Sequence, residues 1–360
     1  MIKHYLKVAF RNLMKYKTQS LVSIIGLAVG FTCFALSALW IRYEMTYDNF
    51  HKGSDRIYMV RAHYANEPGT SKFTPYPLME YLQDKMPEIE AATAFTPHHV
   101  KFRLEETEQE VGMIDADSVF MNFFDIQLLK GTVNFLKSDG QEVAITKEFA
   151  KRLFSKEEDA LGKEVEVGRR VCKIGAIVSG WSNHSNIPYN ILAPARHSPR
   201  WGSSNEQLFI RVRERTDIDA FRTKMSTVRI NDIEKESELS DLLITRMSAL
   251  RYSDYVDKAD VVISFSYIFY FSLAGGLVIC SLFNYLTLFI SRLCMRNREM
   301  ALRKVNGASN KALSVQFAIE LLLLLCIALF SGLLLVEMSM SRFLNFTQIE
   351  PSSYYGEILV

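Results

Sequence analysis

The chain has 360 residues, of which 49% are hydrophobic and 23% are charged, and its formal net charge is +2. These averages suit a soluble protein of about two or three structural units, but the apolar residues are concentrated in three segments. Residues 20–41 and 261–290 contain no charged side chain, and residues 315–336 contain only Glu320. Each segment can cross a bilayer, which takes about 20 apolar residues. The sequence therefore excludes a purely soluble protein, a disordered chain, a collagen and a disulfide-stabilised miniprotein.

Residues 2–16 have the periodicity of a basic amphipathic helix. Apolar and basic side chains recur on two different faces, the apolar ones being Ile2, Leu6, Phe10 and Leu13. Such a helix beside a span lies at the inner membrane surface, in contact with lipids. It serves as a surface anchor, or it also braces a cytoplasmic loop or a partner.

Residues 20–41 predict the first transmembrane helix. A cleaved signal peptide is the alternative, but the apolar run exceeds the usual core of about 7–15 residues and no small-residue cleavage site follows it. We therefore expect an uncleaved anchor.

The basic residues predict the topology. Residues 1–19 hold five lysines or arginines and no acid, and residues 291–314 hold six against Glu299 alone. Short basic flanks stay cytoplasmic, so residues 42–260 and the tail 337–360 are expected outside. Nucleic-acid binding is not expected, because the basic residues lie beside spans, where anionic lipid and topology account for them.

Residues 42–260 predict an α+β domain. Residues 56–63 and 100–104 alternate like half-buried strands, as do VGMIDA, EVAIT and CKIGAIVSG further along. Pro77 is placed to begin a helix, and Thr146 and Asp217 are placed to cap two more. Cys172 is the only cysteine in this segment, so the domain cannot hold an internal disulfide.

Residues 261–290 are longer than one span requires. A helix of that length measures about 45 Å, against about 30 Å of hydrocarbon, so we expect strong tilt or an external stalk. Asn284 lies deep in this segment and needs a hydrogen-bond partner, which helix packing could supply.

Residues 292–308 predict a short helix between the second and third spans. One arc is apolar and another is basic, and Glu299 and Arg303 form an i,i+4 pair. Gly307 marks a helix end. A solvated basic connector would share the charge, but the apolar arc and the defined ends favour a docking surface.

Two blocks of sequence resemble the MacB/FtsX-like ABC-transporter permease family. REMALRKVNGAS (298–309) resembles the signature loop of its permease segment. FFDIQLLKG (123–131), EVAITKEFAKRLF (142–154) and LGKEVEVG (161–168) resemble its external MacB-type domain. The likeness covers most of residues 1–336 in the family's order.

This resemblance implies a membrane protein with three α-helical spans and a large α+β extracytoplasmic domain inserted between spans 1 and 2. It implies a permease subunit in a bacterial inner membrane, with the N-terminus cytoplasmic and residues 42–260 periplasmic. ATP hydrolysis would move the periplasmic domain, a mechanotransmission mechanism that exports or extracts peptides, lipids, lipoproteins or drugs.

The resemblance also implies the partners. The chain contains no GxxxxGKS or GxxxxGKT phosphate loop, so an ABC ATP-binding subunit would hold ATP and magnesium. A second permease chain would complete a homodimer or heterodimer. The ATPase-coupling residues would be Arg296, Glu299, Met300, Ala301, Leu302, Arg303, Lys304, Gly307 and Ala308.

The chain departs from the family after Val336. The family has a fourth span, but residues 337–360 contain no apolar run able to cross a membrane. We expect a truncated permease or the first of two tandem modules.

Glu320 is the ionisable residue within the third predicted span. It either reaches the interface and pairs with Arg292 or Lys311, or it forms a fixed buried contact that locks the span to its partner. The family has an acidic residue at a similar place.

Catalysis and metal or cofactor binding by this chain are not expected. No HExxH or GxSxG motif occurs. Asp115 and Asp117 share a strand face, which would suit an acid pair, but they flank a turn, so we expect capping. We expect surface or turn positions for the six histidines of residues 42–260, which are His51, His63, His98, His99, His184 and His197.

The alternative function is a membrane sensor or regulator. Its ectodomain would bind a ligand or control a cell-wall hydrolase. That protein would need a cytoplasmic signalling domain or partner, and the sequence shows no such domain.

Overall fold

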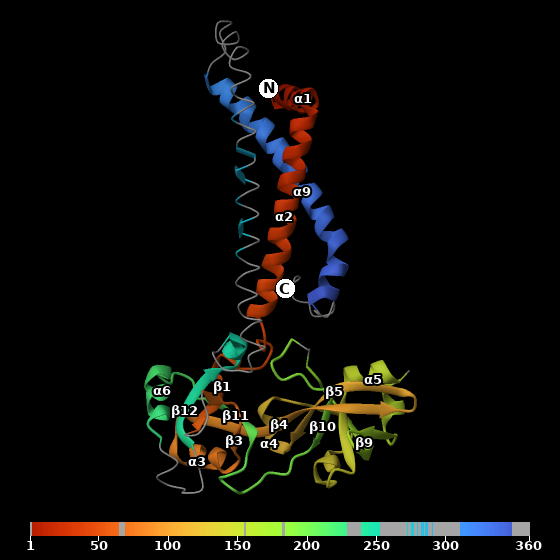
Figure 1. Cartoon of the computed structure of the whole chain (residues 1–360), viewed down its shortest axis with the longest axis vertical. Coiled ribbons are helices and arrows are strands. Elements are labelled where there is room, and N and C mark those ends of the chain that lie inside the picture. Colours follow the sequence, from red (N-terminus) through yellow and green to blue (C-terminus); the bar gives the residue numbers. More distant parts are fainter. Residues whose placement is uncertain are drawn as a thin grey trace. The chain divides into compact units, whose positions relative to one another are not determined.

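The computed structural model describes residues 2–64, 69–154, 156–181, 184–228, 239–252 and 310–347, with isolated helical positions between 272 and 290. The chain divides into two compact units (Figure 1). Met1–Glu44 and Phe265–Val360 form one, and Met45–Ser264 form the other. We call them the helical unit and the ectodomain.

The helical unit contains α1 (Ile2–Lys15), α2 (Lys17–Met45) and α9 (Asn310–Thr347). Among the described residues, two stretches are long and apolar enough to cross a membrane, Lys17–Tyr43 and Ser314–Asn345. Large apolar side chains along both stay exposed, as lipid-facing residues do, among them Leu21, Ile25, Phe34, Leu322, Phe330 and Leu333. The predicted second span, 261–290, lies almost wholly outside the described residues, so the three-span arrangement stays a prediction.

The third predicted span is longer than we expected. We placed its end at 336 and a tail after it, but α9 continues to Thr347. The cause lies in residues 337–347, where Met340 and Leu344 recur at helical spacing and are buried. The charge of Glu337 lowers the hydropathy there without ending the helix.

A close approach joins α2 and α9. A Cβ atom at Gly332 would meet the Ala28 carbonyl oxygen and the Phe31 Cβ, each at 3.2 Å. The Thr32 hydroxyl is shared between the carbonyl oxygens of Ala28, at 2.8 Å, and Gly332, at 3.2 Å. The absence of a side chain at Gly332 therefore lets the two helices pack backbone to backbone.

The described ectodomain is built on a 12-stranded sheet with the main order β12-β1-β11-β4-β5-β10-β7-β9-β6. Its strands are β1 (Ile57–Tyr64), β2 (Thr70–Ser71), β3 (Thr74–Pro75), β4 (Ile89–Leu104), β5 (Thr107–Ala116), β6 (Leu128–Gly131), β7 (Glu142–Thr146), β8 (Glu164–Val167), β9 (Arg170–Val178), β10 (Ile191–Pro194), β11 (Ser204–Val212) and β12 (Leu239–Arg246). Its α-helices are α3 (Pro77–Lys85), α4 (Ser118–Phe123), α5 (Lys147–Leu153) and α6 (Ile218–Ser226), and its 3-10 helices are η1 (Ser54–Arg56), η2 (Val133–Lys137), η3 (Glu157–Ala160) and η4 (Met247–Tyr252). Strands therefore occur at all the predicted positions.

The predicted caps are confirmed. The Thr146 side chain accepts a hydrogen bond from the Phe149 backbone nitrogen at the start of α5. Asp217 accepts from the nitrogens of Asp219 and Ala220 at the start of α6.

The long strand β4 belongs to two halves of the ectodomain. Residues 89–95 pair with β11, and residues 96–104 pair with β5. In Figure 1, α3 and α6 accompany β1, β11 and β12 in the first half, and α5 accompanies β9 in the second. Each half has its own apolar core, with Leu82 and Phe221 in the first and Phe149 and Ile174 in the second.

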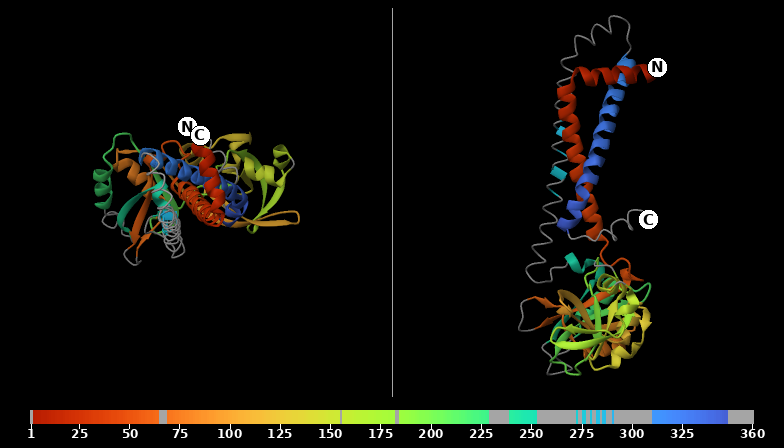
Figure 2. Two further views of the ribbon diagram at one scale, coloured as in Figure 1. Left: turned by 90° about the horizontal axis from the view of Figure 1, so that it is seen from above. Right: turned by 90° about the vertical axis from the view of Figure 1, so that its right-hand side faces the viewer.

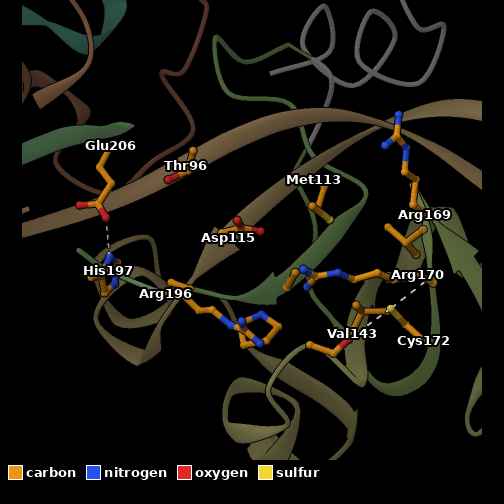
Figure 3. Close-up of a pocket in the computed structure, with 15 residues that line it drawn as sticks. Thr96, Met113, Asp115, Val143, Arg169, Arg170, Cys172, Arg196, His197 and Glu206 are labelled. Atoms are coloured by element: carbon orange, nitrogen blue, oxygen red, sulfur yellow. Dashed lines mark hydrogen bonds and ion pairs between the residues drawn. The ribbon is translucent and has the colours of Figure 1, made fainter. Parts of the chain in front are cut away.

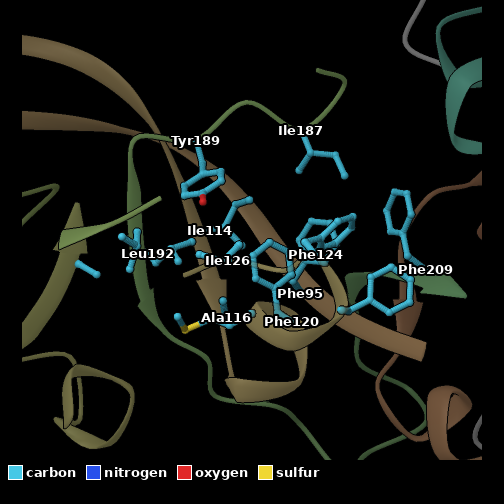
Figure 4. Packing of buried hydrophobic residues seen from close by; sticks show 14 of the residues in the cluster. Phe95, Ile114, Ala116, Phe120, Phe124, Ile126, Ile187, Tyr189, Leu192 and Phe209 are labelled. Carbon is cyan, nitrogen blue, oxygen red and sulfur yellow. The ribbon is translucent and has the colours of Figure 1, made fainter. Parts of the chain in front are cut away.

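A third core lies where the halves meet. The Phe95 ring, on β4, lies 4.8 Å from that of Phe120 on α4 and 5.4 Å from that of Phe209 on β11. Ile114 and Leu192 complete it from β5 and β10 (Figure 4). This aromatic packing holds the two halves together.

Candidate functional site

A fully buried carboxylate, Asp48, lies in the ectodomain just after α2. Its backbone φ is +59°, and the residue has no exposed surface. Asn186 donates to it twice, from the backbone nitrogen at 3.1 Å and from the side-chain nitrogen at 2.6 Å, and the Ser185 hydroxyl also donates. Burial raises the pKa of Asp48, and these hydrogen bonds oppose the rise. The donors make it possible to keep a carboxylate in this place.

This network reaches the segment that leads out of the ectodomain. The Asn186 side chain also donates to the Met247 carbonyl oxygen, in η4, at 3.4 Å. Nearby, the Arg246 Nε donates to the Asp55 carbonyl oxygen at 2.9 Å. Hydrogen bonds thus link the segment that follows α2 to the segment that precedes residue 253. We call these contacts the junction.

Two buried histidines pack at the junction, where we expected surface or turn positions; His51 lies in a turn, but neither is at the surface. His51 and His184 are 7% and 1% exposed. The His51 ring lies 4.8 Å from that of Trp181, and the His184 ring lies 4.4 Å from that of Tyr47. Burial lowers the pKa of His51 to about 4. Sequence reasoning missed them because their partners, apart from neighbouring residues, come from distant parts of the chain.

A cleft of about 380 Å³ opens elsewhere in the ectodomain. Its walls come from strands β4, β5 and β7 to β11, the loop after β10, and the turns before β7 and between β8 and β9. The lining residues are Thr96, Met113, Asp115, Gly140, Val143, Val167, Arg169, Arg170, Cys172, Ala193, Pro194, Ala195, Arg196, His197 and Glu206. His197 and Glu206 lie together at one end, and Arg169 and Cys172 lie at the other (Figure 3).

His197 bridges the two halves of the ectodomain. Its Nδ1 lies 3.0 Å from the Glu206 carboxylate, on β11, and its Nε2 lies 3.4 Å from the Asp117 carboxylate, after β5. Tyr76 stacks on the ring, with centroids 4.0 Å apart. Burial alone would lower the pKa of His197, but Asp117 and Glu206 outweigh it and raise the pKa to about 9.

Asp117 and Asp115 have different partners. Asp117 caps α4 by accepting from the Phe120 nitrogen at 2.8 Å, as predicted. Asp115 instead lies 2.9 Å from the His98 Nε2, a contact that the sequence did not predict. Burial raises the pKa of Asp115, and His98 opposes the rise. The two carboxylates therefore do not act as an acid pair.

In the helical unit, Glu320 accepts a hydrogen bond from the Asn12 side chain at 3.1 Å. Glu320 is 8% exposed. The contact joins α9 to α1, which runs from the start of α2 toward α9 (Figure 2). Glu320 thus has a partly buried contact within its own chain. The predicted partner Arg292 lies outside the described residues, as does the side chain of Lys311.

The other predicted site residues also lie outside the described part of the chain. They are Asn284 in the second predicted span and the coupling residues Arg296, Glu299, Met300, Ala301, Leu302, Arg303, Lys304, Gly307 and Ala308. The described residues hold no group of three or more His, Cys, Asp or Glu side chains suited to a metal ion. Cys172 is a free, buried thiol.

Three solved structures are similar to part of this chain at low sequence identity. A domain described as that of a permease protein from Porphyromonas gingivalis has a TM-score of 0.46 and 18% identity, over 59% of this chain and 99% of that one. The extracellular domain of the ABC-type transporter YknZ from Gram-positive bacteria has a TM-score of 0.39 and 14% identity, over 52% and 99%. The periplasmic region of MacB from Actinobacillus actinomycetemcomitans has a TM-score of 0.40 and 12% identity, over 57% and 95%.

Family comparison covers both units, although no curated protein matched the chain in sequence. The MacB-like periplasmic core domain matches residues 20–228. The FtsX-like permease C-terminal segment matches residues 255–358. The chain therefore belongs to the MacB/FtsX-like permease family, a family of ABC-transporter permeases.

Proposed function

We propose that this chain is the transmembrane subunit of an ABC transporter in which a separate ATPase drives movement of the ectodomain. The work done outside would be export or extraction of peptides, lipids, lipoproteins or drugs. The family supports this assignment, because its members are permeases that work with ATPase partners.

The junction is the observation that supports a driven movement of the ectodomain. Asp48 follows α2 directly, and Met247 precedes the segment that returns to the helical unit. Asn186 bonds to both. A displacement at Asp48 or at Met247 would therefore be passed to the ectodomain through these two hydrogen bonds.

The coupling segment would receive the movement from the ATPase. We assign this role to residues 296–308, with Glu299 and Arg303 as its charged pair. ATP and magnesium would be bound by the ATPase, and a second permease chain would complete the complex. The membrane would be a bacterial inner membrane, with the N-terminus and residues 291–314 on the ATPase side.

The test is co-purification from native membranes. The tagged full chain should recover a subunit that hydrolyses ATP. Glu299→Lys and Arg303→Glu should each lower the recovery severalfold, because each places two like charges four residues apart. The double variant restores an opposite-charge pair and should recover part of the loss.

The matched control is Lys311→Glu, a charge reversal in the same basic segment but beyond the 292–308 helix. It should leave recovery near the wild-type amount. If no ATP-hydrolysing subunit is recovered, or if all four variants behave alike, the coupling proposal is wrong.

A membrane sensor or regulator is the second candidate, and the cleft supports it. A charged cleft between two halves of a domain is a common place for a ligand. A sensor would recover a signalling partner or a hydrolase without an ATPase, so the same co-purification distinguishes the two functions.

A further inference from the structure

The walls of the cleft carry an excess of positive charge. Three arginines and the protonated His197 face two carboxylates, Asp115 and Glu206. Both carboxylates already have partners, since Glu206 contacts His197 and Asp115 contacts His98. Asp115 also interacts electrostatically with Arg170, so the two carboxylates offset part of the positive charge and leave an excess.

The arginines differ in their own contacts. Arg196 pairs with Asp139, through both the side chain and the backbone carbonyl oxygen. Arg169 and Arg170 form no ion pair or hydrogen bond through their side chains with any part of the ectodomain that the structure describes. Two guanidinium groups are thus left with their donors open to a ligand.

A tight hairpin places these two side chains. Val167 of β8 pairs with Arg170 of β9, and Gly168 has a φ of +65° in the turn between them. The Arg170 guanidinium lies beside Gly140, because a Cβ atom there would lie 3.4 Å from its Nη1. A hairpin and not a loose loop therefore positions Arg170 in the cleft lining.

Part of the remaining lining is apolar, and we call this part the floor. Met113, Val143, Val167, Ala193 and the buried Cys172 line it. An apolar floor with a few convergent charged groups is the usual composition of a small-molecule site. Guanidinium groups bind carboxylates and phosphates through paired hydrogen bonds.

We propose that this cleft binds an oxyanion, a carboxylate or a phosphate, carried on a small apolar body. Arg170 holds the oxyanion, Arg169 adds positive charge at the same end of the cleft, and the apolar floor holds the body. The proposal goes beyond the assigned transport function and does not rest on it, since the site would bind such a ligand whether or not an ATPase engages the chain. If the cleft does not bind an oxyanion, the coupling proposal is unaffected. If the coupling proposal is wrong, the cleft could still bind an oxyanion.

Equilibrium binding to the full chain in lipid nanodiscs tests this, with empty nanodiscs subtracted. The probes form two pairs, each with the same apolar body with and without a negatively charged oxyanion. N-acetyl-dileucine is compared with its C-terminal amide, and hexyl phosphate with hexanol. In each pair that the site accepts, the charged member should bind about tenfold or more tightly than the neutral one.

The variant Arg169→Gln with Arg170→Gln should remove this preference, and Arg170→Lys should keep part of it, because it retains the charge without the planar fork. Arg222→Gln, an exposed arginine on α6 that pairs with Asp219, is the control and should bind as the wild type does.

Preference for the charged peptide, the charged phosphate or both supports the proposal and identifies the source of the oxyanion. Equal binding within both pairs overturns it. So does a preference that survives the double variant while circular dichroism shows that variant to be folded.

Discussion

Asn186 donates two hydrogen bonds to the Asp48 carboxylate, one from its backbone nitrogen at 3.1 Å and one from its side chain at 2.6 Å. The same side chain reaches the Met247 carbonyl oxygen at 3.4 Å. One asparagine thus connects the start of the ectodomain with its end, although these parts lie about 200 residues apart in the sequence. Removing the carboxylate would leave several buried donors without an acceptor.

Asp48→Ala should therefore lower the free energy of unfolding of the ectodomain by about 2–4 kcal/mol. Hydrogen exchange on the full chain should also show faster exchange at residues 184–187 and 247–252 than elsewhere. The control is Asp125→Ala. Asp125 also has a positive φ, of +54°, but its side chain is 51% exposed. Equal losses in the two variants would assign the effect to backbone strain and not to the junction.

His197 should make the ectodomain less stable at alkaline pH. Its pKa in the folded chain is about 9, above its ordinary value of 6.5. Its contribution is therefore complete below about pH 6.5 and is lost as the pH rises through about 9. The loss amounts to at most about 3 kcal/mol.

Unfolding by denaturant between pH 6 and 10 measures this effect. The difference between wild type and His197→Gln should shrink as the pH rises, because the variant lacks the cation that Asp117 and Glu206 hold. A constant difference across that range would contradict the prediction.

Asn12 and Glu320 should hold α1 against α9. Glu320→Ala removes the acceptor, so the amides of α1 should exchange about tenfold faster in nanodiscs, which corresponds to about 1.4 kcal/mol. Glu320→Gln keeps one acceptor oxygen and should lie between. Glu337→Gln changes an exposed acid on the same helix and should have no effect on α1. The amount of ATPase recovered with each Glu320 variant should fall in the same order as the protection of the α1 amides.

Gly332 should tolerate alanine better than any larger residue. Alanine needs a shift of a few tenths of an ångström from Ala28 or Phe31, whereas isoleucine would force α2 and α9 apart. Cysteine pairs placed across α2 and α9 should cross-link in the wild-type background and lose efficiency severalfold with Gly332→Ile. Leu333→Ile, at a 58% exposed position, should leave cross-linking unchanged.

Local patterns in the sequence were sufficient for much of the fold. Strand alternation, the cap at Thr146 and the cap at Asp217 depend on residues a few positions apart, so they could be predicted. The run of uncharged residues at 20–41 similarly predicted α2. The end of α9 could not be predicted from hydropathy alone, because Glu337 interrupts the apolar composition but not the helical spacing of Met340 and Leu344.

The sites depend on contacts between distant residues. His98 meets Asp115 because β4 and β5 pair in the sheet, and His197 meets Asp117 across 80 positions. Asp48 meets Asn186 across 138 positions. Such pairs leave no spacing signal in a single sequence. Asp117 was the exception, since a cap three residues from its donor is a local feature.

The shared strand β4 also limits how the ectodomain can deform. A domain whose two halves are joined by flexible loops opens by a hinge motion, with large dihedral changes at a few residues. Here a single 16-residue strand is hydrogen-bonded into both halves, so a hinge opening would break hydrogen bonds between strands. Twisting along the strand costs far less, because sheets already vary in twist from strand to strand. Force delivered to this domain would accordingly be converted into torsion about β4, and the width of the cleft beside Thr96 would change with that rotation.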